Sequence, residues 1–312
     1  MLRRVSVRSR RAAYVALAVL TAIWGSNWIV MKLALERADP VTFNIERTWV
    51  AVAVLFAVLV GQRRLRVPPS WGAVVVTGFF QTTVNFGSTT MALAGGGAGR
   101  TSVLVFTMPF WTLLLAWAVL GERVRGSQWL AIAFALAGLV LVVEPWAWQG
   151  DLAPKLWAVL SGFGWAAGTI AMKYFQRRAD FDMLNLMAWQ MLVGVLPLTL
   201  LPLFIALPGA TWDFSYAILL LWTGAVSTAI GFLLWIAVLR HLSAGTASLN
   251  MFAIPVIALV SSMAIFGERL TRNEWLGIAL IGAGLVVVSV RAWTATRRGE
   301  VSVVAAPPLE GG

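Results

Sequence analysis

The sequence predicts an all-α integral membrane protein in which ten transmembrane helices form two inverted five-helix repeats. Three observations predict this fold: a composition unsuited to water, ten apolar runs of membrane-spanning length, and an internal duplication. Of the 312 residues, 60% are hydrophobic and 12% are charged, whereas a soluble domain carries about 45–50% apolar and about 25% charged residues. The composition therefore excludes a soluble globular fold.

Ten runs are long enough to cross the hydrocarbon core, which takes about 20 mostly apolar residues. They lie at 13–35, 41–61, 71–93, 98–120, 127–146, 154–175, 182–207, 215–239, 244–266 and 273–293. The connections between them are short and leave no room for a soluble domain. The seventh run is the least regular, because Pro197, Pro202 and Pro208 can kink or end it.

The distribution of basic residues predicts the orientation. With ten spans, sixteen of the 24 Lys and Arg residues share the side of the two termini: Arg3, Arg4, Arg8, Arg10, Arg11, Arg63, Arg64, Arg66, Arg123, Arg125, Arg177, Arg178, Arg240, Arg291, Arg297 and Arg298. Five lie on the other side: Arg37, Arg100, Lys155, Arg269 and Arg272. Because cytoplasmic loops carry the excess of basic residues, we expect both termini in the cytoplasm of a bacterial inner-membrane protein. The basic residues form no single patch, which argues against a nucleic-acid partner.

The domain organisation follows from these spans. We expect a basic cytoplasmic N-terminus at 1–12, a first five-helix repeat at 13–146, a second at 154–293 and a disordered cytoplasmic tail at 294–312. The N-terminal apolar run exceeds the 7–15 residues of a signal peptide and lacks a small-residue cleavage site. It is therefore predicted to stay as the first helix.

The internal duplication is seen when the sequence is aligned with itself at a fixed offset. A shift of 146 residues aligns 98–143 with 244–289 at 19 identical positions of 46, including Gly121-Glu122-Arg123 on Gly267-Glu268-Arg269. A shift of 141 aligns Trp24 with Trp165 and Lys32 with Lys173. Because each unit has an odd number of helices, the second enters the membrane from the opposite face. Inverted repeats of this kind are typical of secondary transporters, whose solute site lies between the two halves near the bilayer midplane.

The motifs that carry the repeats resemble the EamA family of the drug/metabolite transporter superfamily. They are Trp24-Gly25-Ser26-Asn27, Glu36-Arg37-Ala38-Asp39-Pro40, Thr107-Met108-Pro109-Phe110-Trp111, Leu120-Gly121-Glu122-Arg123 and Phe266-Gly267-Glu268-Arg269. The resemblance implies a ten-helix bundle with cytoplasmic termini and a cavity among helices 1, 3, 4, 6, 8 and 9. It also implies that most such carriers export amino acids or related metabolites. Glu46 departs from the pattern, where an apolar or small residue is expected.

Glu46 and Arg47 are the charged residues that loops do not explain. Charges at mid-helix cost about 2.5–3.5 kcal/mol on insertion scales, so they are candidate functional residues. One interpretation is a structural Lys32–Glu46 pair with Arg47 extending to the interface. The other places both in the cavity, with Arg47 binding a carboxylate and Glu46 an ammonium or a coupling proton.

Other candidates for solute binding are polar or aromatic residues within spans. Gln81 and Asn85 begin a polar stripe that continues through Ser88 and Thr89 at helical spacing; cavity lining and interhelical hydrogen bonding both explain it. Asn27 and Asn250 are isolated amides, and Trp24 and Trp165 are mid-span partners that face either the cavity or packed neighbours.

Prolines mark matching positions in both halves. Pro109 and Pro255 are predicted to break or kink the fourth and ninth helices, and paired interruptions of this kind point to a transport site. A structural kink is the alternative. The glycine-rich 95–99 segment lacks the Lys-Ser/Thr of a phosphate loop and is predicted to be a hinge turn.

The residue inventory limits the chemistry. Zero Cys and one His, His241, leave no thiolate or His-rich metal site, and we expect no metal, cofactor or catalytic residue. The sequence predicts a secondary transporter that moves a small amphipathic metabolite outward by alternating access. A small-solute importer, a multidrug exporter and a membrane enzyme acting on lipid-linked substrates are the alternatives. Its partners are the solute and the lipid bilayer, with proton coupling through Glu46, and monomer and dimer stay open.

Overall fold

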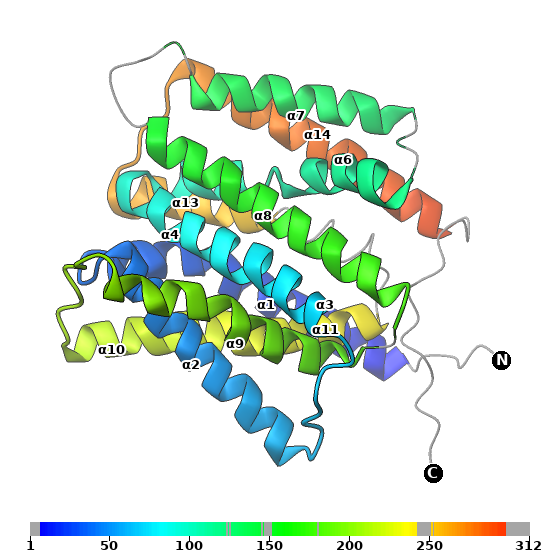
Figure 1. Cartoon of the computed structure of the whole chain (residues 1–312). Coiled ribbons are helices and arrows are strands. Elements are labelled where there is room, and N and C mark those ends of the chain that lie inside the picture. The colour runs from blue at the N-terminus through cyan, green and yellow to red at the C-terminus, as the bar shows by residue number, and fades with distance from the viewer. Residues whose placement is uncertain are drawn as a thin grey trace.

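The computed structural model describes residues 7–122, 124, 126–144, 146, 152–179, 181–241, 251 and 253–297. In these residues the regular structure is helical, apart from one isolated bridge between Ala38 and Ala210 (Figure 1). In its described residues, each of the ten predicted runs contains helical structure, so the prediction of a ten-helix membrane fold is confirmed. Within the described chain, six segments are long and apolar enough to span a membrane by length and composition.

The first repeat has five helical segments. They are α1 (Val7–Ala34), α2 (Pro40–Gly61), α3 (Trp71–Gly78) continued by η1 (Phe79–Val84) and α4 (Asn85–Gly95), α5 (Ala98–Val105) with α6 (Met108–Leu120), and α7 (Ser127–Val143). α1 begins earlier than the predicted residue 13, within the segment expected to be a separate N-terminus.

The second repeat follows the same plan. It contains α8 (Leu152–Gln176), α9 (Met183–Leu200) with the short η2 (Leu201–Leu203), α10 (Phe214–Leu221) continued by η3 (Trp222–Ile230) and α11 (Gly231–His241), α13 (Ala253–Phe266), and α14 (Arg272–Arg297). α9 ends before the predicted residue 207, at a segment that contains Pro202. α14 extends to Arg297, past the predicted start of the tail.

Capping residues set the helix ends. The Asp39 side chain accepts hydrogen bonds from the backbone N–H groups of Val41 and Thr42, both at 3.0 Å, and Pro40 opens α2. Gly121 and Gly267 follow α6 and α13 with φ of +67° and +65°. These left-handed conformations favour glycine, which explains the glycine that begins the Gly-Glu-Arg motif at both helix ends.

The contacts show that the two repeats run in opposite directions. Lys155 at the start of α8 lies 3.8 Å from Glu144 after the end of α7 and 3.8 Å from Glu274 near the start of α14. The end of α7 and the start of its repeat partner α14 therefore lie at the same end of the bundle. The two helices pack side by side along one edge of the molecule (Figure 1). Gly138 and Gly277 make this packing possible, because a Cβ on Gly138 would lie 2.5 Å from the Gly277 carbonyl oxygen.

The first helix of each repeat packs against helices of the other repeat. α1 contacts α11 and α13 of the second repeat, and α8 contacts α4, α5 and α6 of the first. Because the first helices are exchanged between the repeats in this way, the centre of the bundle is lined by both halves.

Three of the membrane segments are interrupted. η1 and η3 are π-helical segments in the third helix of each repeat, where the sequence predicted uninterrupted helix. π-Helical turns often mark functional sites. The fourth helix breaks at Phe106 and Thr107, and the chain resumes with Pro109 in the first turn of α6. Pro255 lies in the first turn of the described part of α13.

Candidate functional site

A cavity of about 120 Å³ lies between the two repeats. A water molecule takes roughly 10–15 Å³ of such space, so the cavity has room for a small solute. Its wall is built from α1, α2, α4, α5 with the start of α6, α8, η3 with α11, and residues 251 and 254 of the ninth segment. The set matches the helices that the resemblance implies around the cavity, together with the second helix, which carries the candidate residues Glu46 and Arg47.

One face of α1 supplies the longest stretch of wall. Trp24, Asn27, Trp28 and Met31 all line the cavity, and their spacing of three and four residues places them on one stripe of the helix. Trp24 is fixed by the hydrogen bond that its Nε1–H donates to the Ser227 carbonyl of η3 at 2.9 Å. The stripe therefore runs from an aromatic end at Trp24 to a sulfur end at Met31.

Arg47 on α2 contributes the one positive charge among the residues that line this cavity. Its side chain is only 4% exposed. Nε donates to Asn44 Oδ1 at 3.2 Å and Nη1 to Met31 Sδ at 2.8 Å, while the guanidinium carbon lies 4.5 Å from the centre of the Phe86 ring. No carboxylate of the described residues lies within ion-pairing distance of Arg47. The cavity thus contains a buried cation whose protein partners are an amide, a thioether and an aromatic face.

Aromatic rings form the wall at the other end of the stripe. Trp165 of α8 stacks on Phe232 of α11 with ring centres 6.1 Å apart and planes 10° from parallel. Trp24 meets the same Phe232 ring edge-on at 6.0 Å. The repeat partners Trp24 and Trp165 are thus brought together through one ring, and all three residues line the cavity.

The polar stripe of the third helix has two roles. Asn85 and Thr89 line the cavity, and both also bind Ser161 of α8. The Asn85 Nδ2 donates to the Ser161 carbonyl and to its Oγ, each at 2.9 Å. The hydroxyl oxygens of Thr89 and Ser161 lie 2.7 Å apart. Gln81 lies on η1 outside the lining set, with its Nε2 donating to Thr169 Oγ1 at 3.3 Å. The stripe therefore joins the third helix to α8, and of its four residues only Asn85 and Thr89 line the cavity.

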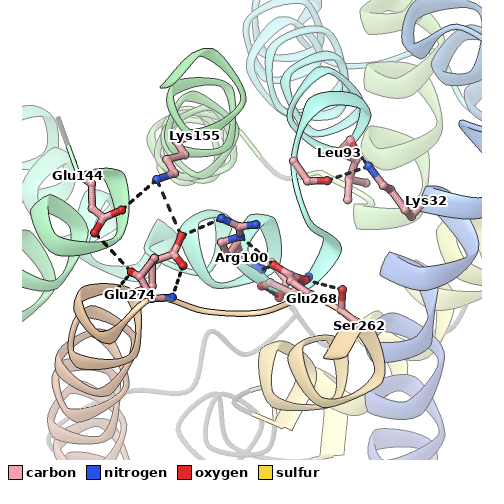
Figure 2. Close-up of polar contacts among 12 residues, drawn as sticks. Lys32, Leu93, Arg100, Glu144, Lys155, Ser262, Glu268 and Glu274 are labelled. Atoms are coloured by element: carbon pink, nitrogen blue, oxygen red, sulfur yellow. Dashed lines mark hydrogen bonds and ion pairs between the residues drawn. The ribbon is translucent and has the colours of Figure 1, made fainter. Parts of the chain in front are cut away.

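Glu46 is placed away from the cavity. It is half-buried, and the Tyr216 hydroxyl of α10 donates a hydrogen bond to its Oε2. Adjacent residues on a helix point about 100° apart, so the presence of Arg47 in the wall turns Glu46 outward. Lys32 does not pair with it; the Lys32 ammonium donates to the carbonyls of Leu93 at 2.6 Å and Gly96 at 2.8 Å (Figure 2). Neither predicted arrangement of Glu46 is therefore seen.

The remaining predicted site residues divide as follows. Asn27, 9% exposed, lines the cavity, and its Oδ1 has no hydrogen-bond partner among the described residues. Pro109 and Pro255 adjoin lining residues rather than lining the cavity themselves. Because proline has no N–H, Pro109 leaves the carbonyl of Val105, a lining residue, without its helical donor. Asn250 lies outside the described residues.

An ionic cluster of Arg100, Glu144, Lys155, Glu268 and Glu274 occupies one end of the bundle (Figure 2). Arg100 Nε lies 3.0 Å from Glu268 and Nη1 lies 2.9 Å from Glu274, whose side chains are 4% and 1% exposed. Glu268 also accepts from the backbone N–H of Gly99 at 2.9 Å and of Arg100 at 3.1 Å, and from the Ser262 hydroxyl. The cluster ties α5 and α8 to the ends of α7, α13 and α14.

The opposite end of the bundle carries more exposed ion pairs. Glu122, 39% exposed, lies 2.7 Å from Lys173 and 2.6 Å from Arg177. Arg64 after α2 pairs with Asp182 before α9. Burial acts to raise the pKa of Asp182, but the hydrogen bonds from the Asn185 N–H and from Arg64 outweigh it and hold that pKa below its ordinary value.

Sequence reasoning missed two parts of this arrangement. Ser227, Thr228 and Phe232 line the cavity from η3 and α11, but their segment gave no polar stripe of its own. The ionic cluster also joins residues far apart in the chain, and only the repeated Gly-Glu-Arg motif pointed to Glu268. Gly99, the last residue of the glycine-rich segment expected to be a hinge turn, donates its backbone N–H to that carboxylate from the first turn of α5, as does the following Arg100.

Comparison with known proteins places the chain among membrane transporters. A model of the EamA-like transporter family matches residues 11–144 and 153–290. "Uncharacterized transporter YoaV" of Bacillus subtilis (strain 168) is 26% identical over 272 residues, covering 85% of this chain and 92% of that protein. "Probable amino-acid metabolite efflux pump" of Escherichia coli (strain K12) is 26% identical over 295 residues, covering 89% and 95%.

The fold is also similar to a solved structure. One crystal structure matches with a TM-score of 0.61 at 18% sequence identity, covering 93% of this chain and 99% of that one. At this identity the likeness extends to the fold alone, and it supports the ten-helix architecture.

Proposed function

The chain belongs to the EamA-like transporter family, and on that premise we propose that it is a secondary transporter exporting a small amphipathic metabolite, an amino acid or a related solute. Family membership makes it a multi-pass membrane transporter and not an enzyme. Relatives named as probable amino-acid metabolite efflux pumps support the solute class and the outward direction over import and over multidrug export.

The observation that carries the proposal is the cavity between the inverted repeats. Its wall takes residues from both halves, so a relative movement of the halves changes its access from one face to the other. Its lining combines aromatic rings with a few polar atoms, the composition typical of sites for small amphipathic molecules. A pathway of this kind fits a carrier that works by alternating access.

The two ends of the bundle differ in a way that supports one direction of opening. At one end the ionic cluster buries Glu268 and Glu274 against Arg100 and Lys155. At the other end the ion pairs of Glu122 are exposed. The distribution of basic residues puts both termini in the cytoplasm and so assigns the ionic cluster to the extracytoplasmic end. We infer that the structure is closed on that side and that export requires the cluster to separate.

We also propose that Glu46 couples transport to protons. Glu46 lies at the contact of α2 with α10, where Tyr216 binds it. A proton there acts on the packing of these helices and not on the solute directly. Glu46→Gln is expected to remove the dependence of transport on a pH gradient.

The experiment is flux through purified protein in proteoliposomes. Vesicles loaded with one of a panel of amino acids and nucleosides, and diluted into buffer, should show saturable release of a subset of the solutes. Vesicles loaded with the same solute but prepared without the protein give the leak rate. Saturable flux of no solute in the panel would overturn the carrier proposal.

A further inference from the structure

Arg47 is a buried charge in need of a counter-ion. Taking an unpaired ion out of water is strongly unfavourable even after the protein relaxes, and no described carboxylate compensates the guanidinium. Asn44 and the Met31 thioether take hydrogen bonds from Nε and Nη1, and the Nη2 group makes none to the described residues. Arg47 is held in place by the protein, but its charge is left for a partner from the cavity.

The thioether contact locates that partner. Met31 Sδ and Arg47 Nη1 are 2.8 Å apart, and Met31 stands one helical turn from Asn27 on the cavity face of α1. The unpaired Asn27 Oδ1 therefore belongs to the residue one helical turn along α1 from Met31, and residues four apart on a helix have Cβ atoms about 5–6 Å apart. An acceptor and a cationic fork at this spacing match an ammonium and a carboxylate carried on one carbon atom.

The rest of the stripe continues away from Arg47. Trp24 lies one further turn along α1, where Phe232 and Trp165 complete the aromatic wall. The cavity thus has a charged end and an apolar end on one continuous surface. A solute whose carboxylate is bound at the Arg47 end can therefore place a large apolar or aromatic side chain at the aromatic end.

We propose that Arg47 is the carboxylate-binding residue of the cavity, that Asn27 Oδ1 accepts a hydrogen bond from the solute ammonium, and that the solute is an α-amino acid with a large apolar side chain. This proposal rests on the proposed function and names the residues that recognise the solute. Among the described residues, Nη2 and the second hydrogen of Nη1 have no protein acceptor, and together they present the two-pronged geometry that a carboxylate accepts. The solute anion supplies the charge that the protein leaves uncompensated.

The test compares probes that differ by one group. Calorimetry on the full chain in detergent measures the binding of three compounds: L-phenylalanine, 3-phenylpropionate and L-phenylalaninamide. 3-Phenylpropionate lacks the ammonium group, and L-phenylalaninamide lacks the carboxylate. L-leucine and L-tryptophan extend the series. We expect the amide to bind at least about 10-fold more weakly than the amino acid, the range of a lost hydrogen bond to a charged group. A smaller loss is expected for 3-phenylpropionate.

Variants assign these effects to residues. Arg47→Gln should weaken L-phenylalanine binding at least about 10-fold and bring the amino acid and its amide to similar affinities. Arg47→Lys keeps the charge without the fork and should recover part of the loss. Asn27→Leu should weaken the amino acid but leave 3-phenylpropionate unchanged. Arg37→Gln, which removes a surface charge paired with Asp213, is the matched control and should bind as wild type.

The outcomes separate this inference from the proposed function. Saturable flux of solutes without a carboxylate, or unchanged amino-acid binding by a folded Arg47→Gln protein, would overturn the role of Arg47 while leaving the carrier intact. Absence of flux for every solute in the proteoliposome panel would instead remove the carrier proposal itself. Wild-type melting of Arg47→Gln in detergent shows that lost binding is not lost folding.

Discussion

The Glu268 carboxylate accepts a hydrogen bond from the backbone N–H of Gly99 at 2.9 Å, joining the end of α13 to the start of α5. Glu268 lies 169 residues along the chain from Gly99, so the contact holds the second repeat against the first. The N-terminus of a helix favours a negative charge, and Arg100 adds an ion pair at 3.0 Å. This contact is therefore the strongest candidate for closing this end of the bundle, the end that the proposed orientation makes extracytoplasmic.

Glu268→Gln is expected to weaken that closure. The amide keeps the shape of the side chain but loses the charge that Arg100 and the helix start bind. The chain has no Cys, so Thr101→Cys places a single thiol beside the cluster, at a position 3% exposed. Maleimide labelling of this introduced thiol should become about 10-fold faster with Glu268→Gln. This factor is expected if loss of the charge destabilises the closed state relative to the open state by about 1.4 kcal/mol.

The repeat supplies the control. Glu122 is the repeat counterpart of Glu268 and lies at the opposite end of the bundle, where its ion pairs are exposed. In the Thr101→Cys background, Glu122→Gln should leave the rate of thiol labelling unchanged. Equal acceleration by both variants would mean that lost charge loosens the whole bundle, and no acceleration by Glu268→Gln would show that the cluster does not hold the end closed.

Gly97→Ala should open the same end without changing any charge. A Cβ at Gly97 would lie 2.2 Å from Glu268 Oε1, so the carboxylate must leave its position against the backbone N–H groups. In the Thr101→Cys background, thiol labelling should rise as it does with Glu268→Gln. Gly61→Ala is the matched control, since a Cβ at Gly61 meets nothing within 4 Å. Identical labelling of the two alanine variants would contradict a role for the hydrogen bonds between Glu268 and the start of α5 in holding this end closed.

Much of the fold follows from local pattern. Runs of apolar residues give the ten segments, and Asp39-Pro40 and the two Gly-Glu-Arg motifs give their ends through capping and positive φ. The π-helical segments η1 and η3 could not be predicted this way. Their residues, rich in Thr and in β-branched and aromatic side chains, are weak helix formers, but this composition does not distinguish a π-helical turn from an ordinary α-helical one.

The site shows the same division. Asn27, Arg47 and Trp165 were candidates because they are polar or aromatic within a span, and the structure brings them to one cavity. Glu46 was a candidate for the same reason, yet it contacts Tyr216 of α10. Span depth is readable from sequence, but which side of α2 meets the cavity depends on the helices around it.

The α7–α14 crossing gives a stability prediction. Gly138→Ala would place a Cβ 2.5 Å from the Gly277 carbonyl oxygen, and backbone cannot move aside as a side chain can. We expect about 1–3 kcal/mol of destabilisation from overpacking, seen as a lower melting temperature in detergent. Gly282→Ala, on α14 with nothing within 4 Å of its Cβ, should melt at or slightly above wild type, because alanine is the better helix former. Equal melting of both variants would contradict the close crossing.

Asp182 predicts a dependence of stability on pH. Its pKa in the folded protein is held below the ordinary carboxyl value by the Asn185 N–H and Arg64, against the opposing effect of burial. A lowered folded pKa adds stability at pH values above the unfolded pKa of about 3.9, and that stability is lost as the pH falls through the folded value. The melting temperature of Asp182→Asn should therefore lie below wild type at pH 7, by the equivalent of about 0.2–1 kcal/mol for a partly exposed ion pair, because asparagine still caps the helix. The gap between the two proteins should narrow below pH 4. A gap that stays constant down to pH 3 would show that the carboxylate charge contributes nothing to this contact.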